Sequence, residues 1–156
     1  MSSFVYVASP LGFTVPTRLF YEHTLLPAIT ERGAVVLDPW LTSAAQFEQA
    51  LGLPAGPERD AALKTANRDA GAANERMIRD STAVFAVLDG VDVDSGTAAE
   101  IGFAAALGRP VVGWRSDFRL AGENPQLLVN LQVEHFVTSL HTDLDEALGA
   151  LQAHLG

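Results

Sequence analysis

The sequence has no cysteine, few basic residues and no long apolar run. Because cysteine is absent from its 156 residues, disulfides and Cys-ligated zinc sites are excluded. Ten Lys and Arg stand against 19 Asp and Glu, giving a net charge of −9. This acidic balance argues against nucleic acid or an anionic membrane as a partner. No stretch approaches the ~18 consecutive apolar residues typical of a membrane-spanning helix.

The composition is otherwise that of a globular protein. Hydrophobic residues make up 48% and charged residues 19% of the chain, which argues against disorder, and the length suits one domain. The first residues lack the basic and apolar regions of a secretory signal. We therefore expect a single domain over residues 1–156, located in the cytoplasm, with no membrane and no nucleic-acid partner.

Short apolar runs alternate with longer helical patterns. Continuous runs are typical of strands buried on both faces of a parallel sheet. They occur at residues 4–8, 35–37, 83–88, 110–114 and, more weakly, 135–137. Helices are predicted over residues 16–32, 58–80, 95–107 and 141–155, with a kink or break at Pro27 and Ser95 as the N-cap of the third. The alternation predicts an α/β fold with a doubly wound, mostly parallel five-stranded sheet and helices on both faces, of the Rossmann or flavodoxin-like type.

Ligands of such sheets bind beyond the carboxyl ends of the strands, which here lead into residues 9–14, 38–43, 89–95 and 115–125. The first of these loops has neither the glycine spacing of a dinucleotide fingerprint nor the lysine of a P-loop, so both kinds of site are disfavoured. Phe13 in that loop is either a surface-packing aromatic or a stacking face for a planar ligand.

An acidic run follows the third predicted strand. Asp89, Asp92, Asp94 and Glu100 fall within 12 positions, but their spacing does not fit an EF-hand loop, and Asp92 is interpreted as a solvated turn residue. Glu100 differs because it lies one turn into a predicted helix among small and apolar residues. A carboxylate is costly to bury there unless it has partners or a chemical role. Glu100 is therefore a candidate nucleophile or general base.

Several motifs occur in one order over residues 4–138. The most specific is Asp-x-Gly-Thr-x-x-Glu-x-Gly at residues 94–102. It is accompanied by the opening strand and loop at residues 5–13, Asp89-Gly90, and residues 107–111, 115–119 and 130–131. On these residues the chain resembles the nucleoside 2-deoxyribosyltransferase family.

The resemblance implies an enzyme that moves 2-deoxyribose between nucleobases by a retaining double displacement through a covalent deoxyribosyl-glutamate. It implies that Glu100 is the nucleophile, that Asp94 protonates or holds the base, and that Tyr6 positions the nucleophile. No metal or cofactor is expected. Nucleosides and nucleobases are the expected small-molecule partners.

The resemblance also implies a substrate-binding set consisting of Ser9, Phe13, Asn74, Asp89, Gly96 and Asn130. Some relatives carry an aspartate where Asn74 stands, and an amide can donate a hydrogen bond but not an acidic proton. Asn130 is expected to reach the sugar of a neighbouring subunit, in a homo-oligomer with shared active sites. The apolar residues around it would form the interface, or would instead pack under the chain's own fifth strand while Asn130 caps a turn.

The residues are also compatible with two alternative functions. Related 2′-deoxynucleoside 5′-monophosphate N-glycosidases tend to carry a serine in place of Asp94, where a carboxylate would repel the phosphate. A non-catalytic nucleotide-sensing module is the other alternative, since fold does not fix function. The presence of Glu100, Asp94 and Tyr6 counts against it.

Overall fold

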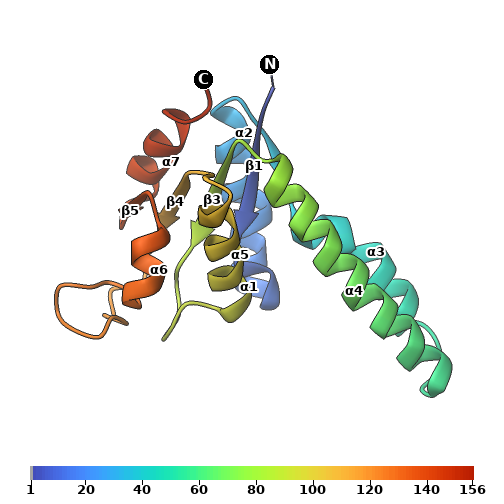
Figure 1. Cartoon of the computed structure of the whole chain (residues 1–156). Coiled ribbons are helices and arrows are strands. Elements are labelled where there is room, and N and C mark those ends of the chain that lie inside the picture. The colour runs from blue at the N-terminus through green and yellow to red at the C-terminus, as the bar shows by residue number, and fades with distance from the viewer. Residues whose placement is uncertain (1) are drawn as a thin grey trace.

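The computed structural model describes residues 2–156 and is built around one five-stranded sheet (Figure 1). The strands are β1 (Ser3–Ala8), β2 (Ala34–Leu37), β3 (Ala83–Val87), β4 (Val111–Trp114) and β5 (Ser139–His141). Their order is β2-β1-β3-β4-β5, and every neighbouring pair is parallel. The predicted doubly wound α/β fold is confirmed, with a sheet that is wholly rather than mostly parallel.

The fifth predicted strand was wrong. Residues 135–137 lie at the end of helix α6 (Leu131–Phe136) and in the residue after it, and β5 begins two residues later. Val133 and Val137 pack on the core at helical spacing, so apolar side chains here do not mark a strand. β5 is a half-buried edge strand without an apolar run.

Helices cover both faces of the sheet. On one face lie the 3₁₀ turn η1 (Leu11–Phe13), α1 (Val15–Phe20), the π-helical turn η2 (Tyr21–Leu25), α2 (Leu26–Glu31) and α7 (Leu144–Gln152). On the other lie α4 (Pro57–Asp80), α5 (Ser95–Ala106) and α6. The α-helical pattern is interrupted ahead of Pro27, as predicted, and the interruption takes the form of the π-helical turn.

Helix α3 (Pro39–Leu51) begins inside a segment that was expected to be a loop. Pro39 occupies its first turn, and Asp38 is its N-cap, accepting a hydrogen bond from the Trp40 amide at 2.9 Å. Together α3 and α4 form a helical hairpin that projects away from the sheet (Figure 1). Within residues 2–156, no helix combines the length and the apolar character needed to cross a membrane.

Helix α5 places the acidic motif at the carboxyl end of β3. Its N-cap is Asp94 and not Ser95, because the Asp94 carboxylate accepts the Thr97 amide. Glu100 therefore lies in the second turn of α5, and Gly108, with φ of +69°, follows the helix end.

Candidate active site

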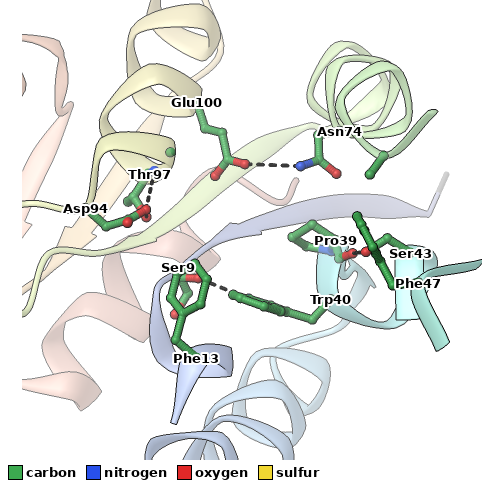
Figure 2. A pocket seen from close by; sticks show the side chains of 12 residues that line it. Ser9, Phe13, Pro39, Trp40, Ser43, Phe47, Asn74, Asp94, Thr97 and Glu100 are labelled. Atoms are coloured by element: carbon green, nitrogen blue, oxygen red, sulfur yellow. Dashed lines mark hydrogen bonds between the residues drawn. The ribbon is translucent and has the colours of Figure 1, made fainter. Parts of the chain in front are cut away.

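A cavity of about 220 Å³ opens at the carboxyl ends of β1 and β3, the two strands between which the winding of the sheet reverses. Segments that follow β1, β2 and β3 all contribute to it (Figure 2). Its lining consists of Ser9, Phe13, Pro39, Trp40, Ser43, Phe47, Ala70, Asn74, Asp94, Gly96, Thr97 and Glu100.

The Glu100 carboxylate is held through one of its two oxygens. Oε1 accepts a hydrogen bond from the Tyr6 hydroxyl at 2.6 Å. It accepts a longer one from Asn74 Nδ2 at 3.4 Å (Figure 2). Tyr6 is fully buried in β1, 94 positions earlier in the chain. Among residues 2–156, no group donates a hydrogen bond to Oε2, so this oxygen remains available for a ligand.

Burial raises the pKa of Glu100 to about 7, because the charged form is poorly solvated in the cavity wall. The hydrogen bond from Tyr6, and to a smaller extent that from Asn74, lowers the pKa of Glu100. The negative charge of Asp94 raises it further. Burial and the Glu100 charge raise the pKa of Tyr6 far above its usual range. Tyr6 therefore keeps its proton and acts as a hydrogen-bond donor near neutral pH.

Asp94 is the second carboxylate of the cavity. Its Oδ2 accepts from the Thr97 amide at 3.0 Å and from the Thr97 hydroxyl at 3.2 Å (Figure 2). Gly96 lies close to this cap, since a Cβ built there would be 3.1 Å from Asp94 Oδ2. The cap fixes Asp94 through one oxygen and leaves Oδ1 without a hydrogen-bond donor among the described residues.

Three aromatic side chains form the opposite wall of the cavity. Phe13 and Trp40 meet edge to face, with ring centroids 4.7 Å apart and planes at 88°, and Phe47 follows on α3. The Trp40 indole Nε1 donates to the Ser9 carbonyl at 3.0 Å (Figure 2). Sequence reasoning missed Trp40 and Phe47 because α3 was not predicted. The signal that was available is Asp38-Pro39, an N-cap followed by a first-turn proline.

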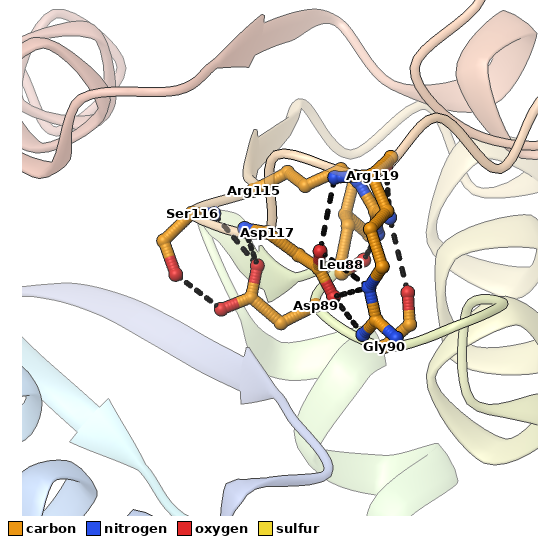
Figure 3. A network of polar contacts seen from close by, with 7 residues as sticks. All are labelled: Leu88, Asp89, Gly90, Arg115, Ser116, Asp117 and Arg119. Atoms are coloured by element: carbon orange, nitrogen blue, oxygen red, sulfur yellow. Dashed lines mark hydrogen bonds and ion pairs between the residues drawn. The ribbon is translucent and has the colours of Figure 1, made fainter.

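Asp89, a predicted substrate-binding residue, lies outside the lining of this cavity. Its carboxylate accepts from the Ser116 amide and hydroxyl, both at 2.6 Å, and from the Asp117 amide at 2.9 Å (Figure 3). In return, the buried Arg115 guanidinium donates to the carbonyls of Leu88 and Gly90. The two loops are thus tied together, which gives Asp89 a structural role.

Asn130 also lies outside the lining. Its Oδ1 caps α6 by accepting from the amides of Gln132 and Val133, and its Nδ2 donates to Glu123 Oε1 at 2.6 Å. The adjacent Val129 is fully buried in the chain's own core, whereas Leu131 is half exposed. The structure thus gives Asn130 the cap that was its alternative role, and its contact with a neighbouring subunit stays a prediction.

The fold and the cavity define a doubly wound α/β protein with a buried carboxylate facing an aromatic wall at the switch point. Residues 5–136 match the sequence profile of the nucleoside 2-deoxyribosyltransferase family, so the chain belongs to that family, as the resemblance predicted. The family acts on the N-glycosidic bonds of nucleosides, with nucleosides and nucleobases as substrates.

Solved structures share the fold at low sequence identity. The 2-desoxiribosyltransferase from Leishmania mexicana is 21% identical, with a TM-score of 0.66 over 97% of this chain and 98% of that one. The 2-deoxyribosyltransferase from Bacillus psychrosaccharolyticus is 20% identical, with a TM-score of 0.60 over 96% of each chain. A CMP N-glycosidase from Clostridium botulinum is 14% identical, with a TM-score of 0.55 over 96% of this chain and 98% of that one. No curated protein matches the sequence.

Proposed function

We propose that this protein transfers 2-deoxyribose between nucleobases, with Glu100 as the nucleophile. The observation that carries the proposal is the Glu100 carboxylate itself, which is held in the cavity through Oε1 while Oε2 is free. The family match supports chemistry at an N-glycosidic bond. The wall formed by Phe13, Trp40 and Phe47 supports a planar base as part of the ligand.

In the first step, Glu100 Oε2 attacks C1′ of a 2′-deoxynucleoside on the face opposite the base. The new C1′–O ester bond forms as the C1′–N bond breaks, and the bonding electron pair leaves with the base nitrogen. Tyr6 contributes by fixing Oε1, so that the carboxylate does not rotate away from C1′. The transition state resembles an oxocarbenium ion, which the negative charge of Glu100 stabilises.

The departing base must gain a proton, and we assign this role to Asp94. Asn74 is unsuited to it, because an amide does not act as an acid at neutral pH. Asp94 is the other carboxyl group of the cavity, and its Oδ1 is left free by the cap to Thr97. In the second step, another base attacks C1′ from the face that the first base left and returns its proton to Asp94. The ester bond breaks, Glu100 is regenerated, and the configuration at C1′ is retained.

The charges of the cavity favour a nucleoside over a nucleoside 5′-monophosphate. Its charged lining residues within the described chain are Asp94 and Glu100, and neither Lys nor Arg is among them. A phosphate placed there would lack a cation and would be repelled by the ionised Glu100 nucleophile. This argues against the alternative 5′-monophosphate N-glycosidase, although a CMP N-glycosidase shares the fold.

We further propose a homo-oligomer in which active sites are shared between subunits. Large apolar side chains are exposed near the carboxyl edge of the sheet, with Phe13 at 69% and Phe118 at 94% of full exposure. Such residues are typical of surfaces that a second chain covers. Within its own chain, Asn130 does not line the cavity, so its proposed sugar contact requires a neighbouring subunit.

The proposal is tested by incubating the protein with 2′-deoxyinosine and adenine and separating the products by HPLC. We expect 2′-deoxyadenosine and hypoxanthine to appear together, and neither to form with Glu100→Ala. Hypoxanthine without 2′-deoxyadenosine would identify a hydrolase, and a parallel reaction with 2′-deoxyinosine 5′-monophosphate would reveal a nucleotide preference. Absence of all products would favour the nucleotide-sensing alternative.

A further inference from the structure

A second buried tyrosine, Tyr21, lies behind the aromatic wall and takes no part in the steps above. It is 1% exposed, and its hydroxyl donates to Asp38 Oδ1 at 2.8 Å. Burial and the charge of Asp38 raise the pKa of Tyr21 well above its usual range, so the hydroxyl keeps its proton. A buried hydroxyl is costly without a partner, and Asp38 supplies it.

Tyr21 is the first residue of the π-helical turn η2. The Leu26 amide donates to the Tyr21 carbonyl, five residues earlier, in place of the usual partner four residues earlier. Pro27, which follows directly, has no amide hydrogen with which to restore the α-helical pattern. A π-helical turn shifts the facing of the side chains around it and is frequent at functional sites. Here the residue that opens the turn, Tyr21, bonds to the residue that follows β2.

Asp38 connects Tyr21 to the aromatic wall. The same Asp38 oxygen, Oδ1, accepts hydrogen bonds from the Tyr21 hydroxyl and from the Trp40 amide. Tyr21 therefore helps to hold Asp38, the N-cap of α3, in place. Trp40 in turn donates its indole Nε1 to the Ser9 carbonyl. Its ring lies directly against the loop after β1, because a Cβ on Gly12 would be 2.3 Å from it.

We propose that Tyr21 is a positioning residue that sets the orientation of Trp40, and through it how tightly the nucleobase is held. The α3–α4 hairpin projects from the sheet (Figure 1), and its entry point at Asp38 determines where the first turn of α3 stands relative to the cavity. Loss of the Tyr21 hydroxyl removes one of the two hydrogen bonds that hold Asp38 Oδ1, so the first turn of α3, and with it the Trp40 ring, is held less firmly. This inference deepens the proposed function and rests on it.

Kinetics with the transferase substrates provide the first test. Tyr21→Phe keeps the buried ring and removes only the hydroxyl. We expect the KM for 2′-deoxyinosine and adenine to rise roughly five- to tenfold with kcat within about twofold, because binding is weakened and Glu100 is untouched. The matched control is Thr30→Val, which removes a hydroxyl from neighbouring α2 whose one hydrogen bond within residues 2–156 is to the Leu26 carbonyl. It should leave both constants unchanged.

Asp38 variants separate positioning from packing. Asp38→Asn retains an acceptor oxygen for both the Tyr21 hydroxyl and the Trp40 amide, whereas Asp38→Ala retains none. Asp38→Ala should therefore raise KM well above the value for Asp38→Asn. Equal KM values for the two variants would overturn the inference.

Trp40 fluorescence tests the inference without relying on catalysis. The sequence has two tryptophans, so a Trp114→Phe background leaves Trp40 as the sole reporter. Adding Tyr21→Phe should shift its emission to longer wavelength, increase its quenching by acrylamide, and weaken the quenching of its emission by added adenine. Unchanged Trp40 emission together with a lower Tm would reduce Tyr21 to a packing role and overturn the inference. If the wild type transfers no deoxyribose, the proposed function fails, and the emission of Trp40 alone decides the role of Tyr21.

Discussion

Replacing Glu100 by glutamine should stabilise the protein in a pH-dependent way. In the folded protein, burial raises the pKa of Glu100 from 4.5 to about 7, whereas the unfolded chain keeps the ordinary value. The folded state therefore retains a proton that the unfolded state releases between these two pH values, so stability falls as pH rises through this window. At 1.36 kcal/mol per unit, the loss is about 3 kcal/mol. Glutamine remains neutral and still offers Tyr6 an acceptor, so it avoids this loss.

The assay is urea unfolding of wild type and Glu100→Gln at about pH 4 and about pH 8. Comparing variants at the same pH cancels the titration of the groups that do not interact with Glu100. We expect similar free energies of unfolding at the lower pH and an advantage of up to about 3 kcal/mol for Glu100→Gln at the higher pH. Glu31→Gln, an exposed carboxylate on α2, is the matched control and should change stability by less than about 0.5 kcal/mol at both. An advantage of equal size at both pH values would refute the reasoning.

Three further predictions concern activity. The acidic limb of the pH profile of kcat/KM should lie near pH 7. It should move to higher pH in Tyr6→Phe, because the hydrogen bond that favours ionised Glu100 is lost. An unchanged limb would show that Tyr6 does not influence the ionisation of the nucleophile. Inosine should react far more slowly than 2′-deoxyinosine, since a 2′-hydroxyl withdraws electrons from the developing cation, and comparable rates by HPLC would argue against deoxyribosyl transfer. Glu100→Ala and Asn130→Ala subunits, refolded together, should regain activity if sites are shared. Native mass spectrometry verifies that mixed oligomers have formed. If these are no more active than the average of the two single variants, Asn130 only caps α6.

The sheet was predictable from sequence because four of its strands appear as continuous apolar runs, and three of them, β1, β3 and β4, are largely buried inside the sheet. β3, with every residue buried, is the clearest case. β5 was misplaced because an edge strand that is half buried on both sides needs no such run. Helix α3 was missed because residues 38–43 were interpreted as a loop at the carboxyl end of a strand, although Asp38-Pro39 marks the start of a helix.

The site was predictable where its residues share one segment. Asp94, Gly96 and Glu100 come together because they occupy the start of one helix. The partnership of Tyr6 with Glu100 is set by the pairing of β1 with β3 and came from the family resemblance rather than from any local pattern.

The roles of polar side chains that hydrogen-bond to the backbone could not be predicted from the sequence. Asp89 and Asn130 look like ligand-binding groups in the sequence, yet their side chains bond to loop amides and a helix N-terminus. A carboxylate or amide side chain in a loop is equally suited to binding a ligand and to binding backbone amides. Only the folded chain shows which one it serves.

The central claim, that Glu100 is the nucleophile, is tested most directly by trapping the covalent intermediate. The protein is incubated without an acceptor base with a 2′-fluoro-arabinosyl nucleoside, whose fluorine destabilises the developing cation and slows release of the sugar. Peptide mass spectrometry should find the mass of the fluorinated sugar on the peptide that contains Glu100, and fragmentation should assign it to that residue. Addition of adenine should then remove the label. Release of free base with no label on any peptide, or a label on another carboxylate such as Asp94, would contradict the account.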